Sequence, residues 1–144
     1  MATYKAKFNS PMSVDEAFGF LADFSNAPEW DANTKSSDLI EGDPYEVGAK
    51  YKVVTGFAGR DLTLTYETIE IDRPNMVKLK SGTGMADIED VMTFESDGSG
   101  SVVSYEANIL PHGIAKVLDP VFALIFKKVG DRAAESLKDA LKAK

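Results

Sequence analysis

The stretch from Asp87 to Ile109, DIEDVMTFESDGSGSVVSYEANI, decides the fold because two alternating runs flank a glycine-rich turn. Residues 87–95 and 101–109 each alternate between apolar and polar side chains, with the period of two that a half-buried strand has. The segment Asp97-Gly-Ser-Gly100 between them is typical of a tight hairpin. The stretch therefore predicts two antiparallel strands that share one apolar face.

The same pattern extends toward the N-terminus, with turn-forming residues about every ten positions. These turns are Gly42-Asp-Pro44, Gly56-Phe-Ala-Gly59, Arg73-Pro-Asn75 and Ser81-Gly-Thr-Gly84. The alternating runs that they separate are 37–41, 49–56, 61–71 and 76–81. With the first hairpin, these runs predict six strands in an antiparallel meander.

The first thirty residues predict another strand followed by two short helices. Residues 3–8 alternate like a strand. Ser13 and Glu16 have the spacing of a capping box, in which each side chain bonds the other's backbone, so a helix begins there. A second short helix is expected over Asn26–Trp30, with Trp30 in the core at one end of the sheet.

The last segment, from about Gly113 to Ala143, is expected to be helical because its apolar residues recur at spacings of three and four. The whole chain, 1–144, is then a single α+β domain: a seven-stranded antiparallel curved sheet wrapped around a long C-terminal helix. Val117 to Phe126 is apolar on all sides. Burial under the short helices explains this; a cavity gate, a dimer contact and a membrane-touching patch remain alternatives.

Composition excludes several classes of function. The chain of 144 residues has a net charge of −7, which argues against a nucleic-acid module built on a basic patch. With no Cys and one His, it lacks a Cys/His zinc site, a Cys nucleophile and disulfides. The longest apolar run, Val121–Phe126, is too short to span a bilayer. We expect a soluble cytoplasmic protein without cofactor or metal, a monomer or weak homodimer, with only transient membrane contact possible.

Two N-terminal segments carry a resemblance to a known family. Phe8-Asn-Ser-Pro-Met-Ser-Val-Asp-Glu-Ala-Phe18 and Asp23-Phe-Ser-Asn-Ala-Pro-Glu-Trp30, with the order of elements, resemble the polyketide cyclase/dehydrase and lipid-transport group. This group belongs to the START-like, helix-grip superfamily, which includes the major birch pollen allergen. The resemblance covers essentially the whole chain. It implies a deep cavity between sheet and long helix that holds a hydrophobic ligand, in members that are cyclases, hydrolases or carriers.

Asp90 is the first candidate for chemistry. The period of two places it with Ile88, Met92 and Phe94 on the expected concave face. A carboxyl group among apolar neighbours has a raised pKa, which suits a general acid or base. A position on the rim, or a bulge that turns Asp90 outward, is the alternative.

Other candidates would line the ligand site. Tyr66 and Tyr105 lie on apolar strand faces, as pocket residues or as ordinary core. Arg60, next to Asp61 in a hairpin, could pair with Asp61 or anchor a carboxylate or phosphate headgroup. His112 at the junction with the helix could move protons or simply lie on the surface. The expected apolar wall consists of Leu64, Met92, Phe94, Phe122 and Phe126.

Two main hypotheses follow. The first is a carrier or sensor that encloses a lipid, polyketide or isoprenoid. The second is a cyclase or dehydratase with Asp90 as acid or base, assisted by Tyr66, Tyr105 or Arg60. A third, weaker hypothesis is a dimerisation or docking module that uses the apolar half of the long helix. The orientation of Asp90 separates the first two, because an outward carboxyl group could not act inside a cavity.

Overall fold

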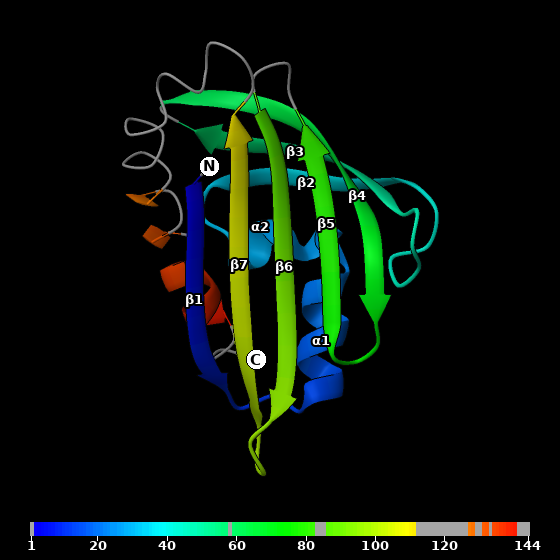
Figure 1. The fold of residues 1–144 in the computed structure, drawn as a ribbon, viewed down its shortest axis with the longest axis vertical. Coiled ribbons are helices and arrows are strands. Elements are labelled where there is room, and N and C mark those ends of the chain that lie inside the picture. The colour runs from blue at the N-terminus through cyan, green and yellow to red at the C-terminus, as the bar shows by residue number, and fades with distance from the viewer. Residues whose placement is uncertain are drawn as a thin grey trace.

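The computed structural model describes residues 2–57, 59–82, 86–111, 127–128, 131–132 and 134–140 (Figure 1). The first part of the chain forms β1 (Ala2–Ser10), α1 (Val14–Ala22), the 3-10 helix η1 (Phe24–Asn26) and α2 (Ala27–Trp30). The strands β2 (Thr34–Glu41), β3 (Lys50–Phe57), β4 (Arg60–Asp72), β5 (Met76–Gly82), β6 (Ala86–Ser96) and β7 (Ser101–Pro111) follow. The described residues from 127 onward are helical.

All seven strands form one antiparallel sheet in the order β1-β7-β6-β5-β4-β3-β2, as Figure 1 shows. The meander of six strands and the antiparallel pairing that the sequence predicts are therefore confirmed. The first strand adds to the end of the meander: β1 pairs with β7 from Ala2 opposite Ile109 to Ser10 opposite Ser101. The two edges of the sheet are thus β1 and β2, so the chain between them must cross one face.

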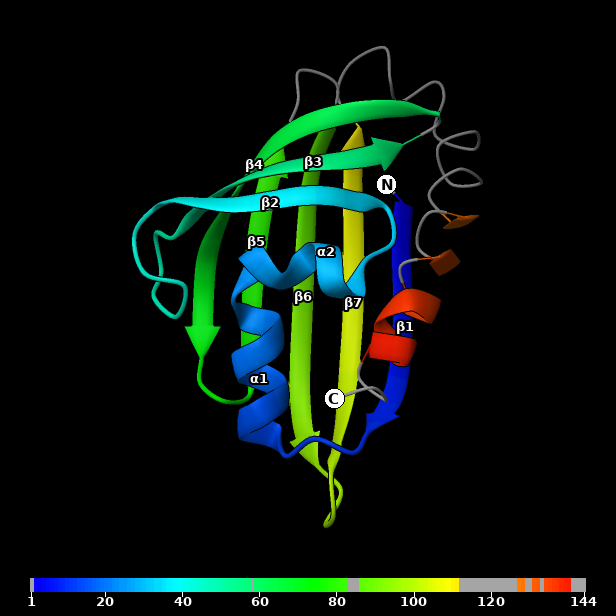
Figure 2. The ribbon, with the colours of Figure 1, turned by 180° about the vertical axis from the view of Figure 1, so that it is seen from behind.

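The helices α1, η1 and α2 make that crossing, and Figure 2 shows them in front of the sheet. The helix α1 begins with the predicted capping box. Ser13 Oγ accepts a hydrogen bond from Glu16 N at 3.2 Å, and Ser13 N donates to Glu16 Oε1 at 3.3 Å. The side of α1 that faces the sheet carries the buried residues Ala17, Phe18 and Leu21. The cap therefore fixes where the crossing begins.

Removal of this cap is expected to weaken the fold modestly. In Ser13→Ala, the backbone N–H of Glu16 loses its partner at the start of α1, and the free energy of unfolding falls by about 1 kcal/mol. Ser13→Asp keeps an acceptor and an N-terminal negative charge, so it retains most of the stability. Urea denaturation followed by circular dichroism measures both. Equal losses in the two variants would contradict a capping role.

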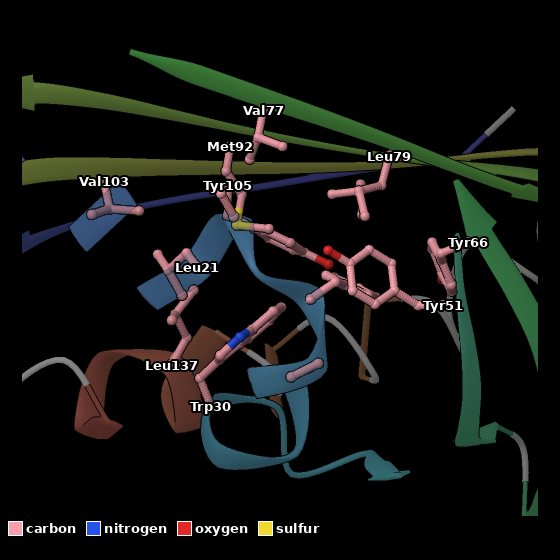
Figure 3. Packing of buried hydrophobic residues seen from close by; sticks show 14 of the residues in the cluster. Leu21, Trp30, Tyr51, Tyr66, Val77, Leu79, Met92, Val103, Tyr105 and Leu137 are labelled. Atoms are coloured by element: carbon pink, nitrogen blue, oxygen red, sulfur yellow. The ribbon is translucent and has the colours of Figure 1, made fainter. Parts of the chain in front are cut away.

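The core lies between the crossing helices and the inner face of the sheet (Figure 3). The Phe24 ring in this core contacts three other rings, with its centroid 4.9 Å from that of Tyr66 and 5.9 Å from those of Trp30 and Tyr51. Trp30 is 1% exposed, as its predicted core position requires. Leu137 of the C-terminal helix is also buried in this cluster, so that helix contributes to the same core.

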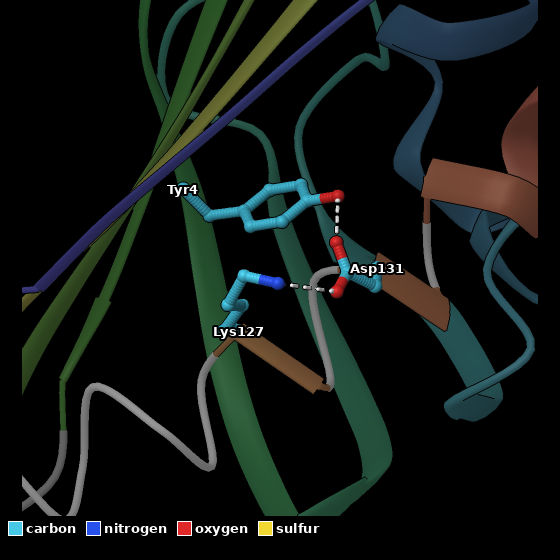
Figure 4. A network of polar contacts seen from close by, with 3 residues as sticks. All are labelled: Tyr4, Lys127 and Asp131. Carbon is cyan, nitrogen blue, oxygen red and sulfur yellow. Dashed lines mark hydrogen bonds and ion pairs between the residues drawn. The ribbon is translucent and has the colours of Figure 1, made fainter.

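One polar contact joins the C-terminal helix to the edge strand β1. The Tyr4 hydroxyl donates a hydrogen bond of 2.8 Å to Asp131 Oδ1, and Lys127 Nζ lies 3.4 Å from Asp131 Oδ2 (Figure 4). Burial and the adjacent carboxylate raise the pKa of Tyr4 to about 12. The hydrogen bond from Tyr4 lowers the pKa of Asp131 and so stabilises its charged form.

Two predictions differ from the structure or lie outside it. The second strand begins at Thr34 instead of residue 37, because a bulge between Thr34 and Ser36 breaks the alternation. The predicted long helix lies mostly outside the described residues. His112 and the apolar run Val117–Phe126, with Phe122 and Phe126, lie there too.

Candidate functional site

Asp90 lies on the inner face of β6, as the alternation predicts. Its residue is 5% exposed, and its neighbours on the same face, Met92 and Phe94, are fully buried. In the sheet, Asp90 lies opposite Leu79 of β5 on one side and Ala107 of β7 on the other. The alternative of an outward-turned carboxyl group is therefore wrong.

The surroundings of Asp90 favour its neutral form. Burial raises the pKa of Asp90 to about 7, with a further increase from the negative charge of Asp31. A hydrogen bond from the Tyr105 hydroxyl acts in the opposite direction, and Glu89 on the outer face adds a small increase. A carboxyl group with this pKa can both donate and accept a proton near neutral pH.

Two tyrosine phenols lie near this carboxyl group. Tyr66 and Tyr105 are buried, and burial followed by the charge of Asp90 raises the pKa of each phenol well above its usual value. Both phenols therefore stay protonated and can donate hydrogen bonds. The Tyr105 ring also contacts Trp30, with centroids 6.3 Å apart. The structure thus places Tyr66 and Tyr105 near Asp90, which is the grouping that the cyclase or dehydratase hypothesis requires.

The hydrogen bond between Tyr105 and Asp90 leads to a direct prediction. Tyr105→Phe removes the donor that stabilises the carboxylate, so the pKa of Asp90 is expected to rise above about 7. A carboxyl carbon titration by NMR measures this shift. Tyr66→Phe removes a phenol that stays protonated and whose own pKa is raised by the charge of Asp90, so it is expected to change the pKa of Asp90 much less. A fall in the pKa of Asp90 in Tyr105→Phe would contradict the assignment.

Three buried polar atoms of the described residues have no hydrogen-bond partner: Trp30 Nε1, Thr68 Oγ1 and Ser81 Oγ. Both hydroxyls belong to the inner face close to Asp90. Thr68 lies opposite Leu79, the strand neighbour of Asp90, and Ser81 lies opposite Ile88. Buried polar groups without partners are rare in folded proteins. The described interior therefore offers one N–H donor and two hydroxyl groups that are free to form hydrogen bonds.

A second acidic group, Asp31, lies between α2 and β2. Its Oδ1 accepts hydrogen bonds from Asn33 N and Nδ2, and its Oδ2 accepts one from Thr34 Oγ1. Burial raises the pKa of Asp31, and this effect is larger than the lowering by these hydrogen bonds and by the positive charge of Arg132. Sequence reasoning missed Asp31, Thr68 and Ser81. The alternation along their strands places Thr68 and Ser81 on the inner face of the sheet, and this pattern could have identified them from the sequence.

The remaining predicted site residues lie as follows. Leu64, Met92 and Phe94 are buried in the core. Arg60 is exposed at the beginning of β4. Its neighbour Asp61 forms an ion pair of 2.7 Å with Lys35.

The described surface also contains an open groove of about 540 Å³ between α2 and the C-terminal helix. Its lining consists of Glu29, Ala32, Arg132, Glu135, Ser136, Asp139 and Ala140. This charged lining differs from the aromatic surroundings of Asp90. Within the described ranges, no group of three or more acidic or His side chains could hold a metal ion, and no helix is long and apolar enough to cross a membrane.

Comparison with solved structures shows the same fold in several proteins. The Zhui aromatase/cyclase from Streptomyces sp. R1128 matches with a TM-score of 0.78 at 10% identity, over 96% of this chain and 90% of that one. A START superfamily protein from Mycobacterium smegmatis matches with a TM-score of 0.76 at 12% identity, over 99% and 96%. Ara h 8.0201 gives 0.69 at 15% identity, over 99% and 98%.

Comparison of the sequence gives the family. No curated protein matches this chain. The family described as "Polyketide cyclase / dehydrase and lipid transport" matches residues 1–142, which is nearly the entire length. The fold, the inner face of the sheet and this match agree, and the protein belongs to the polyketide cyclase/dehydrase and lipid-transport family.

Proposed function

We propose that this protein binds a small hydrophobic molecule of lipid, polyketide or isoprenoid type between the inner face of the sheet and the C-terminal helix, as a carrier or sensor. The unpartnered polar atoms of Trp30, Thr68 and Ser81 carry this proposal. Each such atom costs about 1–3 kcal/mol when nothing bonds it. A ligand with a few oxygen or nitrogen atoms offsets this cost, as in sites with apolar walls and few polar groups.

The wall of the proposed site follows from the inner face. Leu64, Met92, Phe94, Tyr66 and Tyr105 supply buried apolar and aromatic surface. Phe122 and Phe126 complete this wall in the proposal, with Arg60 at its entrance. The protein is expected to work in the cytoplasm as a monomer or weak homodimer, which light scattering at several concentrations tests.

Binding can be measured with the neutral apolar probe N-phenyl-1-naphthylamine. Trp30 is the only Trp of the chain, so quenching of its fluorescence gives a single signal for probe binding, and the variants described next assign the site. We expect saturable binding of one probe per chain, and recovery of an apolar molecule by native mass spectrometry of protein from its own host. Absence of both would overturn the proposal.

A matched pair of variants on β4 tests whether the probe binds at the inner face of the sheet. Thr68 is buried on the inner face and Thr65 is exposed on the outer face. Thr68→Leu fills interior space and is expected to weaken probe binding at least tenfold, while Thr65→Leu leaves it unchanged. Circular dichroism checks that both variants fold. Equal binding by Thr68→Leu and the unaltered protein would contradict an interior site.

A second function, acid–base catalysis of the cyclase or dehydratase type, is favoured by the buried carboxyl group of Asp90 and its pKa of about 7. In this proposal Asp90 removes a proton from a carbon next to a carbonyl group, and the Tyr105 hydroxyl donates a hydrogen bond to the enolate oxygen. Tyr66 assists in the same way.

This second function is tested by exchange of solvent deuterium into 1-tetralone, followed by NMR. Asp90→Asn is expected to slow the catalysed exchange at least about 100-fold, the usual range for loss of a general base. Glu89→Gln, one residue away on the outer face, is the control and retains the exchange. Equal rates for Asp90→Asn and the unaltered protein would remove the enzymatic proposal and leave the binding proposal intact.

A further inference from the structure

The charges around the interior are distributed unevenly. Asp90 is buried, and the negative charge of Asp31 acts on it. No Lys or Arg is buried among the residues that the structure describes. Lys78 pairs with Glu89 at 3.3 Å, while Arg132 is exposed and acts on Asp31. The described interior therefore favours a positive charge and disfavours an anion.

The aromatic rings add to this preference. Trp30 and Tyr105 contact each other, and Phe24 contacts Trp30 and Tyr66, with centroid separations from 4.9 to 6.3 Å. Figure 3 shows Trp30, Tyr66 and Tyr105 on the inner side of the sheet. The faces of such rings attract cations, and more strongly where water is excluded. The Asp90 carboxyl group accepts a hydrogen bond from Tyr105, whose ring contacts Trp30, and this arrangement is suited to an organic ammonium group.

The unpartnered hydroxyls are an independent observation that points to a bound molecule. Thr68 is 0% and Ser81 is 4% exposed, and neither hydroxyl has a partner in the described chain. Leu79 pairs with both Thr68 and Asp90, and Ser81 is two residues further along β5. Hydroxyl oxygens can accept hydrogen bonds from N–H groups. These acceptors and Asp90 belong to adjoining positions on one sheet face.

We propose that the ligand of this interior carries a protonated amine on a hydrophobic body, with the ammonium group paired with the Asp90 carboxylate and facing the aromatic rings. This inference rests on the proposed binding function and names the polar group of its ligand. A carboxylate or phosphate headgroup on the same hydrophobic body would be repelled by Asp90 and Asp31. It would also find no buried Lys or Arg in the described interior to pair with.

The pairing makes binding depend on pH. The groups that act on Asp90 are Asp31 between α2 and β2, Tyr105 of β7 and Glu89 of β6. The charge of Asp90 in turn acts on the Tyr66 phenol of β4. An ammonium group favours the ionised carboxyl group, so binding releases a proton when Asp90 is neutral. With a pKa of about 7, amine affinity is expected to fall about 100-fold from pH 8 to pH 5.

Three probes with one hydrophobic body test the inference: 1-naphthaleneethylamine, 1-naphthaleneethanol and 1-naphthaleneacetate, titrated at pH 8 by calorimetry. The amine is expected to bind at least tenfold more tightly than the acetate, with the alcohol between them. If the alcohol and both other probes fail to bind, the proposed binding function fails. If the alcohol binds but the acetate binds as tightly as the amine or more tightly, only the amine inference is overturned.

A matched pair of variants on β6 assigns the preference to Asp90. Asp90→Asn removes the inner carboxyl group, and Glu89→Gln removes the outer one by the same chemical change. Asp90→Asn is expected to bring amine and acetate affinities within about threefold of each other and to keep alcohol binding, which shows that the site is intact. Glu89→Gln is expected to keep the full preference. An amine preference that survives in Asp90→Asn would overturn the assignment.

Discussion

Trp30→Ala is expected to lower the free energy of unfolding by about 4 kcal/mol, within the range for loss of a large buried aromatic side chain. Trp30 is 1% exposed, and its ring contacts Phe24 at 5.9 Å and Tyr105 at 6.3 Å between centroids. These rings come from the crossing helices and from β7. Loss of the indole leaves a cavity where helices and sheet meet.

Trp30→Phe is the control that separates ring volume from the indole N–H. Because Trp30 Nε1 has no partner in the described chain, its loss removes no hydrogen bond, and the variant is expected to lose only about 1–2 kcal/mol. Urea denaturation followed by circular dichroism measures both variants, since each lacks the fluorescent indole. Equal losses in the alanine and phenylalanine variants would contradict a packing role for the ring.

The strands could be predicted because each half-buried strand repeats its pattern locally. The alternation of buried and less buried residues runs over 90–94 in β6 and 101–109 in β7, and Asp97–Gly100 supplies the turn between them. The start of α1 could be predicted for the same reason, since the Ser13–Glu16 box involves neighbours in the sequence. Patterns among residues that are close in the sequence therefore predicted most of the strands and the start of α1.

The pairing of β1 with β7 depends on contacts between residues a hundred positions apart, such as Ala2 and Ile109. No local pattern encodes it. The early start of β2 was missed because its bulge places Ser36 out of phase. Bulges are set by the neighbouring strand as well as by the strand that contains them.

The candidate site was predictable only in part. Alternation placed Asp90, Tyr66 and Tyr105 on one face, and the structure brings them together. The hydroxyls of Thr68 and Ser81 were missed, because a buried Thr or Ser usually finds a backbone or side-chain partner. Only the three-dimensional arrangement shows that these two have none in the described chain.

Asp90→Asn is expected to be more stable than the unaltered protein near neutral pH, and its advantage is expected to depend on pH. The folded protein holds the pKa of Asp90 at about 7, against an ordinary value of 3.8. Below about pH 4 the carboxyl group is neutral in both folded and unfolded chains. Between these values only the unfolded chain releases the proton, so the free energy of unfolding falls as the pH rises.

The size and limits of this effect follow from the same two pKa values. The difference corresponds to about 4 kcal/mol, which is lost between pH 4 and pH 7 and stays lost above it. Asn keeps an acceptor for Tyr105 but has no proton to release, so its advantage should grow by this amount over the same range. Asp31 titrates in both proteins, so its own desolvation cancels in the difference, and only its repulsion of the Asp90 charge remains as part of the measured effect. Urea denaturation at pH 4, 5, 6, 7 and 8 measures this difference, with Glu89→Gln as the outer-face control. A constant difference across the series would mean that the Asp90 carboxyl group is not desolvated in the folded protein, and the buried acidic site would have to be abandoned.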